Sequence, residues 1–199
     1  MKDELPPSSF ILYPLQSPVL LILKDMPNNN TRILAIDPGT REMGVAFMDG
    51  KKLIYYGVKV IKDGKSPHEK LREGRKIVLR LIKDFKPRVL VVEKAFFCNN
   101  RNAAILNVLV DEIKAVGKRK GLNVMSYAPS TVKKLIYGNG RASKKELSKV
   151  VVSKYPELKV YLTQDRAWKE SYHQNMFDAV ALGLMALSSR TDRSRVGKT

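Results

Sequence analysis

The chain has 199 residues, of which 44% are hydrophobic, and its 37 Lys and Arg against 19 Asp and Glu give a net charge of +18. This length and composition suffice for one domain with a buried core and exclude a mainly disordered chain, while the single cysteine, Cys98, excludes an intramolecular disulfide framework and a multi-thiolate zinc site. The charge favours a polyanionic partner, nucleic acid above all, over a merely solvated lysine-rich surface.

The first 30 residues differ in character from the rest of the chain. Prolines recur there, and Asn28 to Asn30 directly precede a strongly patterned segment. We expect residues 1–30 to form an N-terminal extension that packs on the domain or on a partner chain. Its apolar stretch, 10–23, is broken by Pro14 and Pro18, and no segment reaches the roughly 20 apolar residues of a membrane helix. We therefore expect an intracellular, cytoplasmic protein with no membrane partner.

Residues 33–61 carry the pattern of a three-strand meander. Apolar segments at 33–36 and 44–48 are typical of buried strands, and a third strand is expected over 52–61. Asp49-Gly50 is a hairpin turn signal between the last two strands.

Helical and extended patterns alternate after the meander. The expected elements are a helix from Ser66-Pro67 to Phe85, a strand at 88–92, a helix over 102–120, a strand at 122–127, a short helix over 129–137, a helix opening at Ser143 with Glu146 as its capping box, and a last helix over 175–188. Helix-sized connections make the two later strands parallel to their neighbours. The sequence thus predicts an α/β domain with a mixed five-stranded sheet, the meander plus two parallel strands, flanked by helices.

Three acidic residues stand out in this basic chain. Asp37 and Glu93 follow apolar strands directly, and the carboxyl ends of strands are where α/β sheets place ligand sites. Asp178 interrupts the apolar run of the last helix, where an unpaired carboxylate would be costly to bury. Each acid alone could cap a helix or pair with a local lysine.

Together, converging carboxylates require a cation among them, and oxygen ligands without Cys or His suit Mg²⁺, with Mn²⁺ as a substitute. With a polyanionic partner, the implied chemistry is metal-assisted phosphodiester hydrolysis by two ions per active site, roughly 3.5–4 Å apart.

Four ordered motifs resemble those of the RuvC-type Holliday junction resolvases, a family of the ribonuclease-H-like superfamily. The first is Ile36-Asp37-Pro38-Gly39-Thr40 followed by Gly44-Val45-Ala46. The second is Glu93 with the aromatic and amide residues Phe96, Phe97, Asn99 and Asn100. The third comprises Pro129, Val132-Lys133, Gly138-Asn139-Gly140 and Ala142-Ser143-Lys144-Lys145, and the fourth is Asp178-Ala179-Val180-Ala181-Leu182. The resemblance covers about residues 32–189, so we expect a nuclease domain over 31–189 and a basic, frayed tail over 190–199.

The resemblance implies a homodimer that binds four-way junction DNA and nicks two opposing strands, an activity of DNA recombination and repair. By position, Asp37, Glu93 and Asp178 would hold the metals, Phe96 would stack on a base near the junction, and Lys133 and Lys144 would contact the scissile phosphate. Helix 102–117 has a broad apolar face that could serve both the core and a dimer interface.

A basic band is expected to hold the DNA backbone. Residues 118–149 contain nine basic residues and one acidic residue, Glu146. With the second motif, the expected DNA contacts are Phe96, Phe97, Asn99, Asn100, Lys118, Arg119, Lys120, Lys133, Lys134, Arg141, Lys144, Lys145 and Lys149.

One residue departs from the family pattern. The family usually has Asp or His three residues before the final Asp, and here that place is Asn175, whose amide oxygen can coordinate a metal but is neutral and cannot act as a base. Natural tolerance, an engineered inactivating change and substitution by His173 are all open. Asn175 also keeps open a second function, a protein that binds branched DNA without cutting it. A third is a RuvC-like nuclease that acts on RNA.

Overall fold

The meander predicted for residues 33–61 forms as an antiparallel sheet. The structure is a computed structural model that describes residues 31–61, 66–94, 101–162 and 167–196, and in it β1 (Arg32–Asp37), β2 (Glu42–Asp49) and β3 (Lys52–Val60) pair antiparallel. Asp49 pairs with Lys52 across the hairpin, and Gly50 between them has a φ of 57°, the left-handed region in which glycine is favoured.

The two later strands complete a mixed sheet. β4 (Val89–Glu93) pairs parallel with β1, and β5 (Asn123–Tyr127) pairs parallel with β4, so the strand order is β3-β2-β1-β4-β5. Asp37 ends β1 and Glu93 ends β4, and the two strands are neighbours. The prediction of a five-stranded sheet with a three-strand meander and two parallel strands is confirmed.

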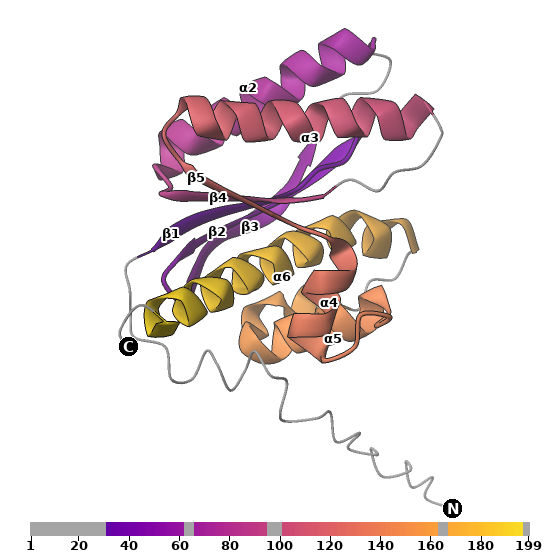
Figure 1. Cartoon of the computed structure of the whole chain (residues 1–199). Coiled ribbons are helices and arrows are strands. Elements are labelled where there is room, and N and C mark those ends of the chain that lie inside the picture. The colour runs from indigo at the N-terminus through magenta and orange to yellow at the C-terminus, as the bar shows by residue number, and fades with distance from the viewer. Residues whose placement is uncertain (1–30, 62–65, 95–100, 163–166, 197–199) are drawn as a thin grey trace, which may run out of the picture.

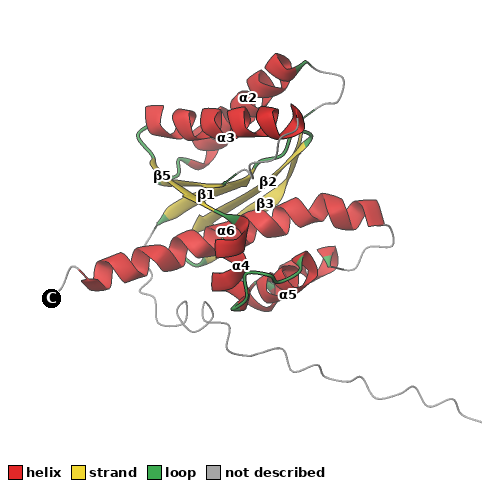
Figure 2. Ribbon diagram, turned by 45° about the vertical axis from the view of Figure 1, so that its right-hand side comes forward, coloured by secondary structure: helices red, strands yellow, loops and turns green. Residues whose placement is uncertain are grey.

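Helices cover both faces of this sheet (Figure 1). One layer contains α2 (Pro67–Phe85) and α3 (Arg101–Arg119). The other contains α4 (Pro129–Tyr137), α5 (Lys144–Lys154) and α6 (Ala167–Val196), with the 3₁₀ helix η1 (Pro156–Tyr161) after α5. Figure 2 shows the same three layers from a second direction. Among the described residues, none of the helices has the length and apolar character needed to cross a membrane.

Local signals explain where two of the helices begin. Ser66 accepts a hydrogen bond from the Glu69 backbone N–H, and the Glu69 side chain accepts one from the Ser66 N–H, which is a capping box. Ser143 and Glu146 form the same reciprocal pair at the start of α5, as predicted. This cap fixes the first turn of α5, and Lys144 is the first residue of that turn.

The last helix is longer than predicted. The expectation was a helix over 175–188 followed by a frayed tail, whereas α6 begins at Ala167 and continues to Val196. Neither 167–174 nor 189–196 contains Gly or Pro, so no residue breaks the helix at either predicted end. The apolar run that Asp178 interrupts covers only the part of α6 packed on the sheet. The 3₁₀ helix after α5 was not predicted.

Alternation along the central strands divides the core into two clusters. Ile33 and Ala35 of β1 pack with the buried residues of α6, whereas Leu34 and Ile36 pack with the buried residues of α2 and α3. β2 and β4 alternate in the same way. Every residue of these strands can therefore be assigned to the α6 face or to the α2 and α3 face of the sheet.

Candidate active site

Strand alternation directs two of the predicted acids to the same face. Asp37 continues the series of Ile33 and Ala35, and Glu93 continues that of Val89 and Val91, so both lie on the α6 face. Because β1 and β4 are parallel neighbours, with Ile36 paired to Val92, the two carboxylates meet at the same edge of the sheet.

Asp178 comes to the same place from the opposite layer. It lies on α6 between the buried residues Phe177 and Ala179, with 13% of its side chain exposed. A cleft of about 280 Å³ lies between the sheet edge and the helices. It is lined by Asp37, Pro38, Glu93, Pro129, Val132, Lys133, Lys144, Leu147, Asn175 and Asp178. All six residues predicted from sequence to act in catalysis therefore line one cleft.

The three carboxylates are poorly solvated and repel one another. Burial raises the pKa of Asp37 well above its usual value, and the charges of Glu93 and Asp178 raise it further. Burial, followed by the charge of Asp178, raises the pKa of Glu93 to about 7. Burial also raises the pKa of Asp178. Near neutral pH the three carboxyl groups therefore tend to bind protons or to require a nearby cation.

Two lysines supply part of that charge. The Lys144 ammonium lies 3.6 Å from an Asp178 carboxylate oxygen, and it opposes the rise of all three pKa values. Lys133, on α4, opposes the rise in the pKa of Glu93 and Asp178. Lys144 remains 63% exposed despite this ion pair, so its side chain can also reach an anion in the cleft.

Sequence analysis missed Gln174, which orients Asp178. The Gln174 amide donates from Nε2 to Asp178 Oδ1 at 3.0 Å, while its Oε1 accepts from the Ser148 hydroxyl of α5 at 3.3 Å. The signal was present in the spacing, because residues four apart lie on one face of a helix. Gln174 thus connects α5 to the carboxylate of α6.

The donor set fits a hard divalent cation. Carboxylates line the cleft together with the Asn175 amide, and no Cys or His is present among the described residues that line it. In the present side-chain arrangement, however, the described residues contain no group of three or more His, Cys, Asp or Glu side chains that could hold one metal ion. Burial is the main cause of the raised pKa values, and a bound cation would favour the charged carboxylates that burial disfavours.

Asn175 lines the cleft, whereas His173 does not. The ring of His173 lies 4.7 Å from that of Tyr161 and 5.2 Å from that of Tyr172, measured between centroids. The Asn175 amide donates from Nδ2 to Glu42 Oε2 at 3.4 Å. Glu42, at the start of β2, is a second residue that sequence analysis missed.

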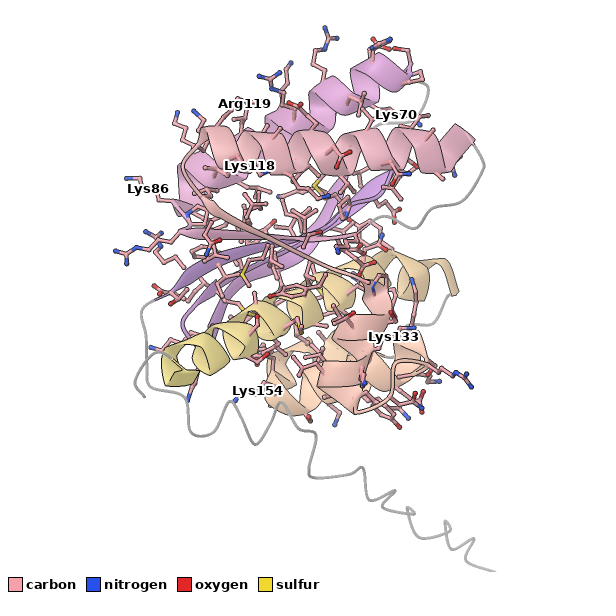
Figure 3. All side chains as sticks on the ribbon, viewed as in Figure 1. Lys70, Lys86, Lys118, Arg119, Lys133 and Lys154 are labelled. Atoms are coloured by element: carbon pink, nitrogen blue, oxygen red, sulfur yellow. The ribbon has the colours of Figure 1, made fainter. Side chains whose placement is uncertain are left out.

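The predicted basic band is divided in space. Lys134, Arg141, Lys144 and Lys145 lie on the exposed surface of α4, α5 and their connection, and Lys149 of α5 is half-buried. Lys118, Arg119 and Lys120 lie at the end of α3, before β5, so the length of that strand separates them from α4. Figure 3 places Lys118 and Arg119 on one side of the sheet and Lys133 on the other. Phe96, Phe97, Asn99 and Asn100 lie outside the described residues.

The sequence matches a known family. A family model described as "Crossover junction endodeoxyribonuclease RuvC" matches residues 33–167. The protein of that name from Prochlorococcus marinus (strain MIT 9312) is 34% identical over 125 residues, which cover 61% of this chain and 80% of the relative. Its counterpart from Geotalea uraniireducens is 29% identical over 178 residues, which cover 84% of this chain and 98% of the relative.

Solved structures show the same fold. RuvC of Thermus thermophilus superposes with a TM-score of 0.63 at 22% identity, covering 81% of this chain and 97% of that one. RuvC of the same organism in complex with Holliday junction substrate also gives 0.63, at 21% identity. The yeast mitochondrial Holliday junction resolvase Ydc2 gives 0.59 at 14% identity and covers 89% of this chain. The ribonuclease-H-like fold expected from the sequence is confirmed.

Proposed function

The chain belongs to the RuvC family of crossover junction endodeoxyribonucleases, and we propose that it resolves four-way DNA junctions by hydrolysing phosphodiester bonds. One observation carries the proposal: Asp37, Glu93 and Asp178 converge, with Lys133 and Lys144, in a single cleft. Such a cleft combines acceptors for a cation with donors for a phosphate, and metal-assisted hydrolysis of a phosphodiester uses both.

The carboxylates are proposed to hold the metal. Asp37, Glu93 and Asp178 would bind two Mg²⁺ ions, or Mn²⁺ in their place, with the Asn175 amide oxygen as a further ligand. When bound, these ions would activate the attacking water and stabilise the leaving 3′ oxygen. The hydrogen bond from Gln174 holds Asp178 toward the cleft, and the close approach of β1 to β4 sets Asp37 beside Glu93.

The lysines and the apolar lining are proposed to receive the DNA. Lys144 is paired with Asp178 and still largely exposed. When a cation neutralises the carboxylate, the Lys144 ammonium can instead donate hydrogen bonds to a phosphate oxygen. Lys133 approaches the same carboxylates from α4. Pro38, Pro129, Val132 and Leu147 form the apolar part of the cleft lining. The predicted roles of Phe96, Phe97, Asn99 and Asn100 remain part of this proposal.

Cutting two opposing strands requires two active sites, so we also propose a symmetric homodimer. Leu109, Val110, Ile113 and Val116 of α3 are buried against the sheet and are already used by the core. Val108 is 52% exposed, and Ile105 and Leu106 are half-buried. The amino-terminal half of α3 is therefore the part available to a second copy. A cytoplasmic location stays a prediction.

A cleavage assay tests the proposal. Labelled four-way junction, flap and duplex substrates are incubated with the full chain in Mg²⁺ and in Mn²⁺, beside Asp37→Asn. We expect paired nicks in the junction alone, and loss of cleavage by Asp37→Asn with junction binding retained in a gel shift. Full nicking by Asp37→Asn would overturn the assignment of the site.

A non-cleaving junction binder is the second candidate, because the ligand position at 175 is a neutral amide. It predicts junction-selective gel shifts without products in either metal. Cleavage of a structured RNA in preference to the DNA junction would instead favour an RNA-directed nuclease.

A further inference from the structure

The neutral ligand Asn175 has a carboxylate beside it that the family motifs do not include. Glu42 occupies the first position of β2, and its Oε2 accepts a hydrogen bond from Asn175 Nδ2 at 3.4 Å. Glu42 and Gly44 are two residues apart on a strand, so both lie on the face that Ala46 and Met48 present to α6.

The backbone fixes this pairing. Gly44 pairs with Asp37 of β1, and a Cβ at Gly44 would lie 1.8 Å from the carbonyl oxygen of Asn175. The α6 backbone therefore lies directly on β2 at this level. This contact sets residue 175 next to Glu42 on one side and to the Asp37 strand on the other.

The hydrogen bond decides which atom of the amide is available. A carboxylate can only accept, so the group that Asn175 turns to Glu42 must be its NH₂. The remaining polar atom of the side chain is Oδ1, the only one of its atoms that can bind a cation. Without Glu42 the amide could rotate and present its NH₂ group to the cleft instead.

We propose that Glu42 is a positioning residue for Asn175. It holds the amide with Oδ1 directed to a divalent cation in the cleft. Its carboxylate also supplies, next to residue 175, the negative charge that the neutral amide lacks. The inference rests on the proposed function, because it concerns the metal held by the same carboxylates. It treats Glu42 and Asn175 as one unit in place of the single acidic ligand usual in the family.

A double-mutant cycle on metal binding tests it. Mn²⁺ is titrated into the full chain without DNA, and free Mn²⁺ is followed by its electron paramagnetic resonance signal. The four proteins are wild type, Glu42→Gln, Asn175→Ala and the double variant. Loss of a partner that orients a ligand costs about 10–100-fold in metal affinity, and we expect that loss for Glu42→Gln. In the Asn175→Ala background, the same change should cost less than about threefold.

Two controls separate this role from others. Glu157→Gln, on the exposed surface of the 3₁₀ helix, removes the same charge elsewhere and should leave Mn²⁺ affinity unchanged. Asn175→Asp combined with Glu42→Gln places the carboxylate directly at the ligand position and should restore at least wild-type affinity. Thermal melts of each variant confirm folding. A merely structural role of Glu42 would give the same loss in both backgrounds of the cycle.

The outcomes distinguish the two proposals. Equal Mn²⁺ affinity of wild type and Glu42→Gln, or an equal loss with and without Asn175, overturns the role of Glu42 even if junctions are cut. If the wild-type chain binds no Mn²⁺, the metal-dependent function and the inference both fail. If it binds Mn²⁺ with the expected coupling but cuts no junction, only the proposed function fails.

Discussion

Gly44 and Asn175 touch backbone to backbone, since any side chain at Gly44 would overlap the Asn175 carbonyl. Gly44→Ala must therefore separate β2 from α6, and overpacking of this kind costs about 1–3 kcal/mol. We expect a Tm lower by about 2–12 °C in a thermal melt, together with weaker Mn²⁺ binding, because residue 175 is displaced from the cleft.

Gly57→Ala is the matched control, because a Cβ there meets its nearest atom at 3.5 Å, an ordinary contact. Its Tm should stay within about 2 °C of wild type. Equal melting of wild type and Gly44→Ala would contradict the close approach of β2 and α6.

Metal affinity should depend on pH near neutrality. The pKa of Glu93 is raised to about 7, so below that pH a cation must displace a proton from it. For one such proton, Mn²⁺ affinity should fall about tenfold per pH unit below pH 7. Titrations between pH 5.5 and 8.5 measure this slope. A flat profile across that range would show that Glu93 does not bind the metal.

The same shift should lower the stability of the metal-free protein. A carboxyl whose pKa is raised on folding stabilises the fold fully below its unfolded pKa, and this stabilisation is lost as the pH rises through the folded value. For Glu93 this pH window runs from the ordinary pKa of a glutamate carboxyl, 4.5, to its raised pKa of about 7.

Glu93→Gln should therefore raise the Tm of the metal-free protein at pH 8, by about 2–4 °C for each kcal/mol of relieved repulsion. The gain should shrink as the pH falls toward 4.5, and Mn²⁺ should stabilise wild type more than the variant. Melting curves in chelator at four pH values provide the measurement. A gain that is constant with pH would point to packing rather than charge.

The two groups of the basic band should contribute differently to DNA binding. Lys134, Arg141 and Lys145 lie on the side of the cleft, whereas Lys118, Arg119 and Lys120 lie at the opposite end of β5, with Arg119 paired to Glu112 at 2.9 Å. Each phosphate contact contributes about 0.9 to the dependence of log affinity on log salt concentration.

Replacing Lys134, Arg141 and Lys145 together by Gln should reduce the slope of log affinity against log salt concentration by about 2–3 in junction-binding titrations. The same replacement of 118–120 should change it by less than about 1. A larger effect from residues 118–120 would show that they also contact the DNA backbone, as the single basic band predicted from the sequence requires.

Local sequence rules predicted the sheet and the convergence of the three acids, for physical reasons. Alternation in β1 and β4 determines the face on which Asp37 and Glu93 lie, and strand ends determine the edge. Glu42 could not be recognised in this way, and the helical spacing of Gln174 and Asp178 indicated only the local part of the Gln174 contacts. Their roles depend on the level at which α6 lies on β2 and on the position of Ser148, and both are tertiary contacts. The predicted basic band is divided in the fold, because closeness along the chain is not closeness in space, and its role in DNA binding stays a prediction.

Strand alternation also makes folding and function depend on one alignment. Ile36 and Asp37 are adjacent, and they point to opposite faces of the sheet. A shift of β1 by one residue against β2 would bury the Asp37 carboxylate among the apolar side chains of α2 and α3 and turn Ile36 toward the cleft. Misaligned chains would thus lose both core packing and the metal-binding acid. Selection against misfolding and selection for chemistry therefore act on the same hydrogen-bond register.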